Sequence, residues 1–161
     1  MKINFTIKEL LLKETFSIAY GSYDKRDVLL IQLSHQNCKG YGECVAIDYY
    51  QIDLKSFVLK LKEIQSQIEI QKIIHPKEFF KFLFNLNLHS FLLSALDCAY
   101  WDLFGKLENK SFIELNQLPS ENLVESSITI SVGDIDKQIQ KIQESSWNKF
   151  KVKCKGLNKS N

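Results

Sequence analysis

The stretch Lys149-Phe150-Lys151-Val152-Lys153-Cys154-Lys155-Gly156 alternates basic and apolar residues. Successive side chains of an extended strand point to opposite faces, so Lys149, Lys151 and Lys153 share one face of this predicted strand. That face has two interpretations: a solvated edge whose like charges discourage pairing with another strand, or a set of amines lined up in a catalytic cavity. Two amines one strand repeat apart, roughly 7 Å, disfavour each other's charged form, which suits one of them to act as a general base.

The composition is that of a globular protein. Of the 161 residues, 45% are apolar and 25% are charged, which is enough for one ordinary core, or for one small domain and part of a second. The 21 basic and 19 acidic residues give a net charge of +2 and are interspersed until the last dozen positions. This pattern argues against a nucleic-acid surface, and we expect no nucleic-acid partner.

The cysteines and the apolar runs indicate the cellular compartment in which the protein is expected. The four cysteines are far apart, form no CxxC pair and predict reduced core thiols of a cytoplasmic protein; they are Cys38, Cys44, Cys98 and Cys154. Residues 1–9 alternate apolar and polar side chains, which is unlike a signal peptide, and no apolar run is long enough to span a membrane. We therefore expect no membrane partner.

The first third of the chain predicts three strands. Residues 3–7 alternate apolar and polar side chains, residues 27–33 form a continuous apolar run, and a third strand begins near residues 40–44. Residues 15–26 contain turn-forming residues and predict a loop. Short connections predict an antiparallel meander, whose apolar face requires a layer of helices.

Four helices are predicted next. Apolar residues recur at helical spacing over 54–68, behind a possible N-cap at Asp53. A second helix follows Pro76, and its dense aromatic residues, 79–84, are expected in the core. A third, over 90–106, is apolar nearly all round and is expected to be the buried central helix. A short fourth helix covers 112–115.

After Pro119 the pattern changes to a strand over 126–132, a helix from about 135 to 145, and then the lysine strand. A strand, a helix and a strand within about thirty residues form a βαβ unit, which implies parallel pairing. We therefore expect two domains, residues 1–118 and the start of a second over residues 119–161.

Several of these segments together resemble the enolase superfamily. They are the helix ALDCAYWDLFGK (95–106), followed by SSITISVGD (126–134) and KFKVKCKG (149–156), with GYGEC (40–44) and FSIAYG (16–21). Within that superfamily the chain looks most like the muconate-lactonizing subgroup and its dipeptide epimerases of the L-Ala-D/L-Glu type. The resemblance implies an α+β capping domain followed by the first βαβ unit of an incomplete (β/α) barrel.

The resemblance also implies roles for individual residues in an enzyme that acts on a small-molecule substrate, a dipeptide. Lys151 and Lys153 match the family's Lys-x-Lys, where Lys153 would abstract the proton α to a carboxylate and Lys151 would be its cationic neighbour. Thr129 matches a substrate-contacting position on the first barrel strand. Tyr20 and Ser22 lie in the segment that matches the capping loop, which selects substrate side chains.

A Mg²⁺ ion is implied by the same resemblance, because it would hold the enediolate that proton abstraction creates. The family's acidic ligands and its second catalytic lysine belong to later barrel strands. A barrel takes about 250 residues, whereas 43 residues follow Leu118 in this sequence. We therefore expect a chain truncated after the second barrel strand and inactive by itself, with assembly into a homo-oligomer left open.

The capping loop departs from the pattern of the Ala-Glu enzymes. No carboxylate-binding arginine is placed in it, because the nearest arginine, Arg26, falls where the second strand is expected to begin. Two alternatives to a dipeptide epimerase stay open. The first alternative is another muconate-lactonizing-subgroup enzyme, such as an o-succinylbenzoate synthase. The second is a non-catalytic, stand-alone capping module.

Overall fold

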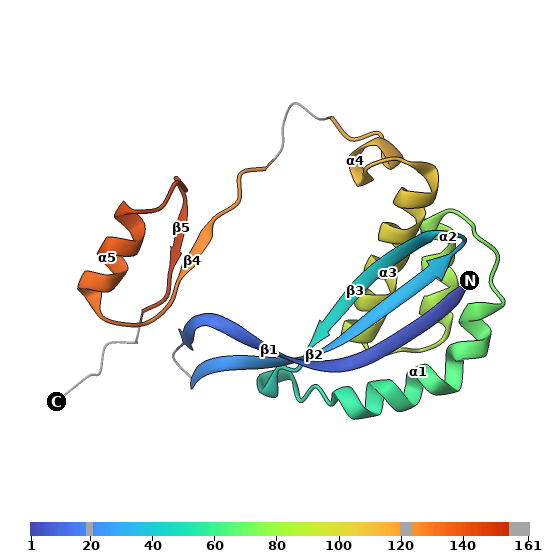
Figure 1. Cartoon of the computed structure of the whole chain (residues 1–161), viewed down its shortest axis with the longest axis horizontal. Helices are drawn as coiled ribbons and strands as arrows, with labels where there is room; N and C mark the ends of the chain where they lie inside the picture. Colours follow the sequence, from blue (N-terminus) through green and yellow to red (C-terminus); the bar gives the residue numbers. More distant parts are fainter. Residues whose placement is uncertain (19–20, 120–123, 155–161) are drawn as a thin grey trace. The chain divides into compact units, whose positions relative to one another are not determined.

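The computed structural model describes residues 1–18, 21–119 and 124–154 (Figure 1). The chain divides into two compact units. Unit 1 comprises Met1–Leu10 and Asp27–Pro119, and unit 2 comprises Leu11–Arg26 together with the described part of Ser120–Asn161. Residues 11–26, which we call the hairpin end, thus group with the βαβ segment. The expected domain division at 118/119 stays a prediction.

The sheet is the predicted meander of three strands, β1 (Lys2–Ile18), β2 (Gly21–His35) and β3 (Cys38–Val45), in the order β1-β2-β3. Strands β2 and β3 are antiparallel, and Leu29 lies opposite Cys44 in their register. Both of these side chains are buried, so this pair contributes to the core that the helices cover.

The predicted loop over residues 15–26 is wrong, because β1 and β2 continue into it as a long hairpin. Side-chain hydrogen bonds across the two strands stabilise this extension. The hydroxyl of Thr15 donates to Oδ1 of Asp24 at 2.5 Å, and the hydroxyls of Ser17 and Ser22 are 2.8 Å apart. Turn-forming residues therefore act here as cross-strand partners.

The four predicted helices are confirmed. They are α1 (Leu54–Glu69), α2 (Pro76–Asn85), α3 (Ser90–Glu108) and α4 (Phe112–Leu115), and a 3₁₀ turn, η1 (Asp48–Tyr50), precedes them. In Figure 1 the long helices of unit 1 lie against its sheet. The apolar stripes at helical spacing bury residues of α1, α2 and α3 in one core with the strands, which gives the meander the helical layer that it requires.

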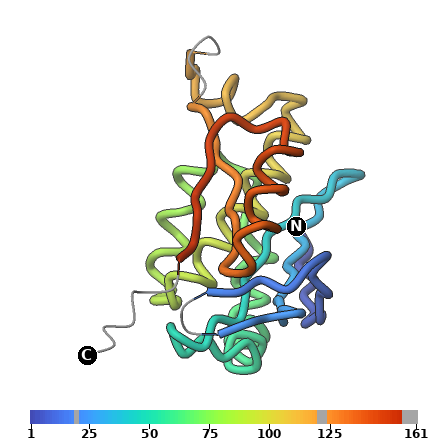
Figure 2. Tube along the Cα trace, turned by 90° about the vertical axis from the view of Figure 1, so that its left-hand side faces the viewer, coloured from blue at the N-terminus to red at the C-terminus, as the bar shows by residue number. Residues whose placement is uncertain are grey.

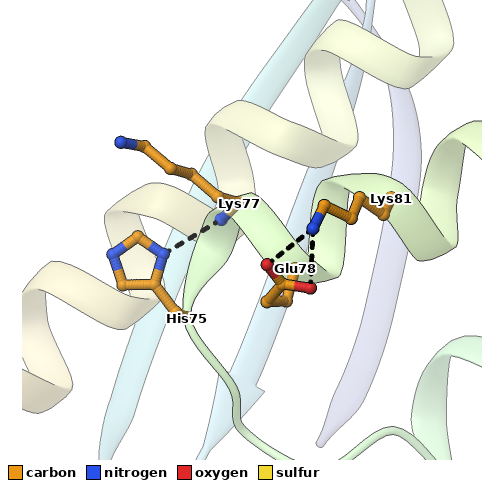
Figure 3. Close-up of polar contacts among 4 residues, drawn as sticks. All are labelled: His75, Lys77, Glu78 and Lys81. Atoms are coloured by element: carbon orange, nitrogen blue, oxygen red, sulfur yellow. Dashed lines mark hydrogen bonds and ion pairs between the residues drawn. The ribbon is translucent and has the colours of Figure 1, made fainter.

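Local chemistry fixes where the helices begin. The carboxylate of Asp53 caps α1, as predicted, and accepts a backbone N–H at 2.9 Å. At the start of α2, Nδ1 of His75 accepts the backbone N–H of Lys77 at 3.3 Å (Figure 3). One turn further on, the ammonium of Lys81 donates to both carboxylate oxygens of Glu78, at 2.8 and 3.1 Å. This ion pair is exposed and contributes little to stability.

Helix α3 is central, as predicted. The ring of Tyr100 stacks on that of Phe79 with centroids 3.8 Å apart, and its hydroxyl donates to the backbone oxygen of Ile74 at 2.8 Å. Both rings are fully buried. The prediction that all the aromatic residues of α2 are core is wrong, because Phe80 is 38% exposed and Phe84 is 66% exposed. These two rings lie four residues apart on the outer face of the helix and pack on each other.

Two glycines allow β3 to lie directly on α3. A Cβ atom added at Gly40 would overlap the backbone oxygen of Ala99, and one added at Gly42 would overlap that of Ala95. Ala95 and Ala99 are one helical turn apart and both buried. The two glycines of β3 therefore face a part of the helix surface that carries only small side chains. This close approach fixes the helix on the sheet.

Unit 2 contains the predicted βαβ unit, formed by β4 (Ile128–Ile130), α5 (Ile135–Gln143) and β5 (Phe150–Val152). The strands pair in parallel, with Ile128 opposite Phe150. Figure 2 shows them running side by side. Both strands are shorter than predicted. Among the described residues, no helix combines the length and apolarity needed to cross a membrane.

All four cysteines are free thiols, but the prediction of four core thiols is wrong for two of them. Cys44 is buried in the sheet, whereas Cys98 and Cys154 are exposed. Cys98 lies one turn after Ser94, and both are exposed on α3. Cys154 follows the end of β5.

Candidate active site

The two lysines of the predicted Lys-x-Lys lie on one face of the parallel pair. Thr129 is opposite Lys151 in the register, so their side chains point to the same side. The backbone N–H of Lys153 donates to the oxygen of Ile130 at 2.9 Å and continues the ladder beyond the last residue of β5. Strand alternation therefore groups Thr129, Lys151 and Lys153, and turns Ile130, which is buried, to the opposite face.

The lysine row, which consists of Lys149, Lys151 and Lys153, differs in exposure along its length. Lys149, just before β5, forms an exposed ion pair with Glu125, as expected for a solvated edge. Lys151 is exposed, and Lys153 is half-buried. The solvated-edge interpretation fits Lys149. The catalytic interpretation stays a prediction for Lys153, which lies at the carboxyl end of the strand, where (β/α) proteins bind ligands.

Lys153 lines a hollow of about 530 Å³ in unit 2. Its described lining residues come from the hairpin end, from the segment after β4 and from the segment after β5: Ser17, Ile18, Ser22, Val132, Gly133, Ile135, Gln138, Lys153 and Cys154. The structure therefore brings Ser22 and Lys153 together, two of the five residues for which the sequence suggested a role. Thr129 and Lys151 are not among the lining residues, and Tyr20 lies outside the described part of the chain.

Hydrogen bonds hold the walls of the hollow. The backbone N–H of Val132 donates to the oxygen of Ser17 at 3.0 Å, which ties the hairpin end to the segment after β4. The Ser17 hydroxyl is paired with that of Ser22. On the opposite wall, the side-chain amide of Gln138 donates to the oxygen of Ser131 at 2.6 Å. Most of the polar groups around Lys153 are thus already engaged with one another.

A second contact fastens the hairpin end to α5. The ammonium of Lys141 pairs with the carboxylate of Glu14, and both side chains line a neighbouring hollow of about 560 Å³. Helix α5 is capped by Asp134, whose carboxylate accepts the N–H of Lys137 at 3.1 Å. The hairpin end therefore contacts both the segment before α5 and the helix itself.

Sequence reasoning missed most of the lining residues. Gly133 and Asp134 form the connection between a strand and the helix that follows, so the carboxyl end of β4 was visible in the sequence. Gln138 lies just over one turn into α5 and could have been named from the same signal. No comparable signal existed for Ser17, because only the tertiary contact with Val132 brings it to this place.

The described residues do not form a metal centre. No three of their histidine, cysteine, aspartate and glutamate side chains are grouped so that they could hold a metal ion. Lysine, serine and glutamine, which surround the hollow, are not a donor set for Mg²⁺, which prefers carboxylates and water. The described lining residues therefore do not fit the ion that the resemblance implies.

Sequence comparison finds relatives among curated enzymes. Two proteins named L-Ala-D/L-amino acid epimerase, from Maribacter sp. and Flavobacterium johnsoniae, are each 33% identical over 95% of this chain. An o-succinylbenzoate synthase from Listeria innocua is 28% identical over 78% of it. The chain spans 45%, 46% and 34% of these relatives' lengths. No protein-family model matches the sequence.

Solved structures share the fold. A dipeptide epimerase from Methylococcus capsulatus, complexed with Mg and L-Arg-D-Lys, aligns over 97% of this chain and 46% of its own, with a TM-score of 0.82 and 17% identity. A member of the enolase superfamily from Listeria innocua aligns over 89% of this chain and 40% of its own, with a TM-score of 0.65 and 27% identity. Sequence and fold agree with the resemblance in the strands, the central helix and the parallel pair, and the chain belongs to the enolase superfamily.

Proposed function

We propose that this chain is part of a dipeptide epimerase, which inverts a carbon α to a carboxylate by removing and returning its proton. The observation that carries the proposal is the position of Lys153, half-buried at the carboxyl end of β5 and lining a hollow with the hairpin end. The names of the relatives from Maribacter and Flavobacterium support the same reaction class.

In this proposal Lys153 is the base on one face of the substrate. An amine can accept a proton only in its neutral form, and Lys151, two residues earlier, would be its cationic neighbour. Thr129 would contact the substrate from the neighbouring strand. Ser22, with Tyr20 beside it in the sequence, would contact the substrate side chain from the hairpin end.

The proposal for the whole protein includes Mg²⁺, which is present in the solved dipeptide epimerase of the same fold. When bound, the ion would supply the counter-charge for the enediolate. Its ligands and a second base would lie outside the described residues, and residues 1–118 and 119–161 would be the capping domain and the start of the barrel. We therefore propose that the 161-residue chain is inactive by itself.

Exchange of the substrate α-proton with deuterium from solvent tests these statements. We expect no Mg²⁺-dependent exchange by the 161-residue chain with L-Ala-L-Glu or with hydrophobic dipeptides. Joining the chain to the part of the Maribacter relative that lies beyond the match should create exchange. In that longer protein Lys153→Ala should abolish exchange on its own face, whereas Lys149→Ala, a matched control at an exposed ion pair, should retain it.

Two results would contradict the proposal. Metal-dependent exchange by the 161-residue chain would show that this length is sufficient for the reaction. Full exchange after Lys153→Ala in the longer protein would show that another group is the base. Because Lys149 and Lys153 both alternate along the same strand, an equal loss with both variants would point to net charge rather than to a base at Lys153.

An o-succinylbenzoate synthase is the second candidate function, and the relative from Listeria innocua favours it. The synthase reaction would also require a base beside a carboxylate. The position of Lys153 therefore does not distinguish a synthase from a dipeptide epimerase. Product analysis of the longer protein with both substrate classes would decide. Formation of o-succinylbenzoate without dipeptide exchange would replace the first proposal with the second.

A stand-alone, non-catalytic capping module is the remaining alternative. In the 161-residue chain Val152 is 46% exposed and Ile135 on α5 is 70% exposed, so unit 2 presents apolar surface that favours association. Light scattering and limited proteolysis would test this alternative. A monomer that resists protease through residue 154 would support a self-sufficient module, whereas aggregation or rapid cleavage of unit 2 would support an incomplete barrel.

A further inference from the structure

We infer that the outer edge of strand β1 pairs with the same edge of a second copy of this chain, so that the two β1 strands form an antiparallel ladder. The surface is part of one continuous strand, Lys2–Ile18, and consists of residues 8–14, KELLLKE, which we call the edge segment. The inference is independent of the proposed reaction, because the edge segment contains none of the residues that line the hollow beside Lys153.

Backbone hydrogen bonds at the two ends of β1 show which residues face its outer edge. Strand β1 lies at one edge of the sheet (Figure 1), and the N–H and C=O of one residue point to the same side of a strand. The N–H of Ile3 points away from β2, because it donates to the carboxylate of Glu69 at 3.2 Å. The oxygen of Ser17 also points away from β2, because it accepts the N–H of Val132 at 3.0 Å. Each end of β1 therefore indicates that the odd-numbered residues face outward.

The edge segment is exposed on both of its faces. Six of its seven residues are exposed, and only Leu12 is half-buried. The side chain of Leu11 is 78% exposed and that of Leu10 is 40% exposed. A long edge strand with exposed apolar side chains is a template for pairing with another strand. This strand therefore has the exposure that an intermolecular ladder requires.

The charges of the edge segment are complementary to themselves when two copies run antiparallel. A twofold axis at Leu11 places Lys8 opposite Glu14 of the second copy, Glu9 opposite Lys13, and leucine opposite leucine. Moving the axis to residue 10 or 12 would place leucines opposite charged side chains. Opposite charges on facing residues stabilise a strand pair and like charges destabilise it. The charge pattern therefore favours a second copy of this chain as the partner, in one register.

This register also assigns the hydrogen bonds. Leu11 would exchange backbone N–H···O bonds with Leu11 of the second copy, and Glu9 would exchange them with Lys13. The ion pair between Glu14 and Lys141 of the same chain is compatible with this arrangement, because a carboxylate accepts more than one donor. A ladder of seven residues is smaller than a standard interface, so we expect a dimer that dissociates on dilution.

Charge reversal followed by mixing tests the inference. Sedimentation of the 161-residue chain from about 1 μM to about 1 mM should show a monomer and a dimer in equilibrium. Glu9→Lys places lysine opposite lysine, and Lys13→Glu places glutamate opposite glutamate, so each variant alone should dimerise at least about tenfold more weakly. An equimolar mixture of the two variants should dimerise like the wild type, because their edge segments are complementary again. Lys60→Glu on α1, a matched control outside β1, should not change the dissociation constant.

Amide hydrogen exchange locates the contact within the strand. The N–H groups of Glu9, Leu11 and Lys13 should exchange more slowly in the dimer than after dilution. Those of Leu10 and Leu12, which face β2, should exchange equally in both.

Three outcomes would overturn the inference. The first is a monomer at every concentration. The second is a loss of dimer in the single variants that mixing does not restore. The third is association that all variants share, without slower exchange at the odd-numbered residues, which would point to the exposed apolar side chains of unit 2.

Discussion

The backbone N–H of Tyr41 in β3 donates a hydrogen bond of 2.9 Å to Oδ2 of Asp102 in α3. Strand β3 is at one edge of the sheet, so its outward N–H groups are open to pairing with another chain. The ammonium of Lys106 donates to the same carboxylate oxygen at 2.7 Å and to the backbone oxygen of Lys39 at 2.8 Å. A helix thus supplies both partners that an additional strand would otherwise provide.

Removal of this acceptor should weaken unit 1. We expect Asp102→Ala to lower the free energy of unfolding by about 1 kcal/mol, since the Tyr41 N–H would lose its partner and recover only part of it from water. Asp102→Asn keeps an acceptor oxygen and should cost less. Urea unfolding followed by circular dichroism measures both. Equal stability of the alanine variant and the wild type would contradict this prediction.

A side chain at Gly42 should be poorly tolerated. The added Cβ of Gly42→Ala would overlap the backbone oxygen of Ala95, so β3 and α3 must separate, at a cost of about 2–3 kcal/mol. Gly133→Ala is the matched control, because no atom lies within 4 Å of its added Cβ. We expect that control to change stability by less than about 0.5 kcal/mol. Comparable losses in both variants would rule out the close approach as the cause.

The pH dependence of stability should change when Asp97 is replaced. Burial raises the pKa of this carboxyl above its ordinary value, and its Oδ1 has no hydrogen-bond partner among the described residues. A raised folded pKa means that the folded chain binds the proton more tightly. Its contribution to stability is therefore full below the unfolded pKa and is lost as pH rises through the folded pKa.

We accordingly expect Asp97→Asn to be more stable than the wild type at neutral pH, with a difference that shrinks as the pH falls below about 4, the unfolded value. Subtracting the two unfolding curves removes the other titrating groups, which both chains share. A difference that stays constant between pH 3 and pH 7 would show that Asp97 titrates normally.

Glu69 should have the opposite pH dependence. The side-chain amide of Gln65 donates to its carboxylate at 3.0 Å and the backbone N–H of Ile3 does so at 3.2 Å, which together hold the pKa of Glu69 below its ordinary value. Its contribution to stability is present above the unfolded pKa and is lost as pH falls through the folded pKa. Glu69→Gln should therefore be less stable than the wild type at pH 7 and nearly equal to it in acid. Urea midpoints across that range measure the difference, and a gap that widens in acid would contradict the assignment.

Much of unit 1 could be predicted because its signals are local. The cap at Asp53 and the apolar stripes depend on residues within one or two helical turns, so the helices were found close to their observed bounds. Exposure around a helix was less predictable. Phe84 and Cys98 have apolar side chains, and nothing within their own helices indicates which face the rest of the protein covers.

The candidate site was predictable only along the strands. Period-two alternation predicts that Lys151 and Lys153 share one face, and parallel pairing places Thr129 opposite Lys151. The hairpin end was misread as a loop, because its strands are held by pairs such as Thr15 with Asp24 that only the folded register reveals. Arguments from sequence neighbours therefore could not identify the hairpin-end residues that line the hollow with Lys153.

The bond between Val132 and Ser17 also has an evolutionary consequence. The proposed base is positioned by a strand ladder near one end of the sequence, whereas the surface that would meet the substrate side chain is encoded near the other. Under the proposed function, substitutions in a few codons of the hairpin end would therefore alter selectivity while leaving the geometry of β5 untouched. In such an arrangement, chemistry and recognition can evolve separately within one gene.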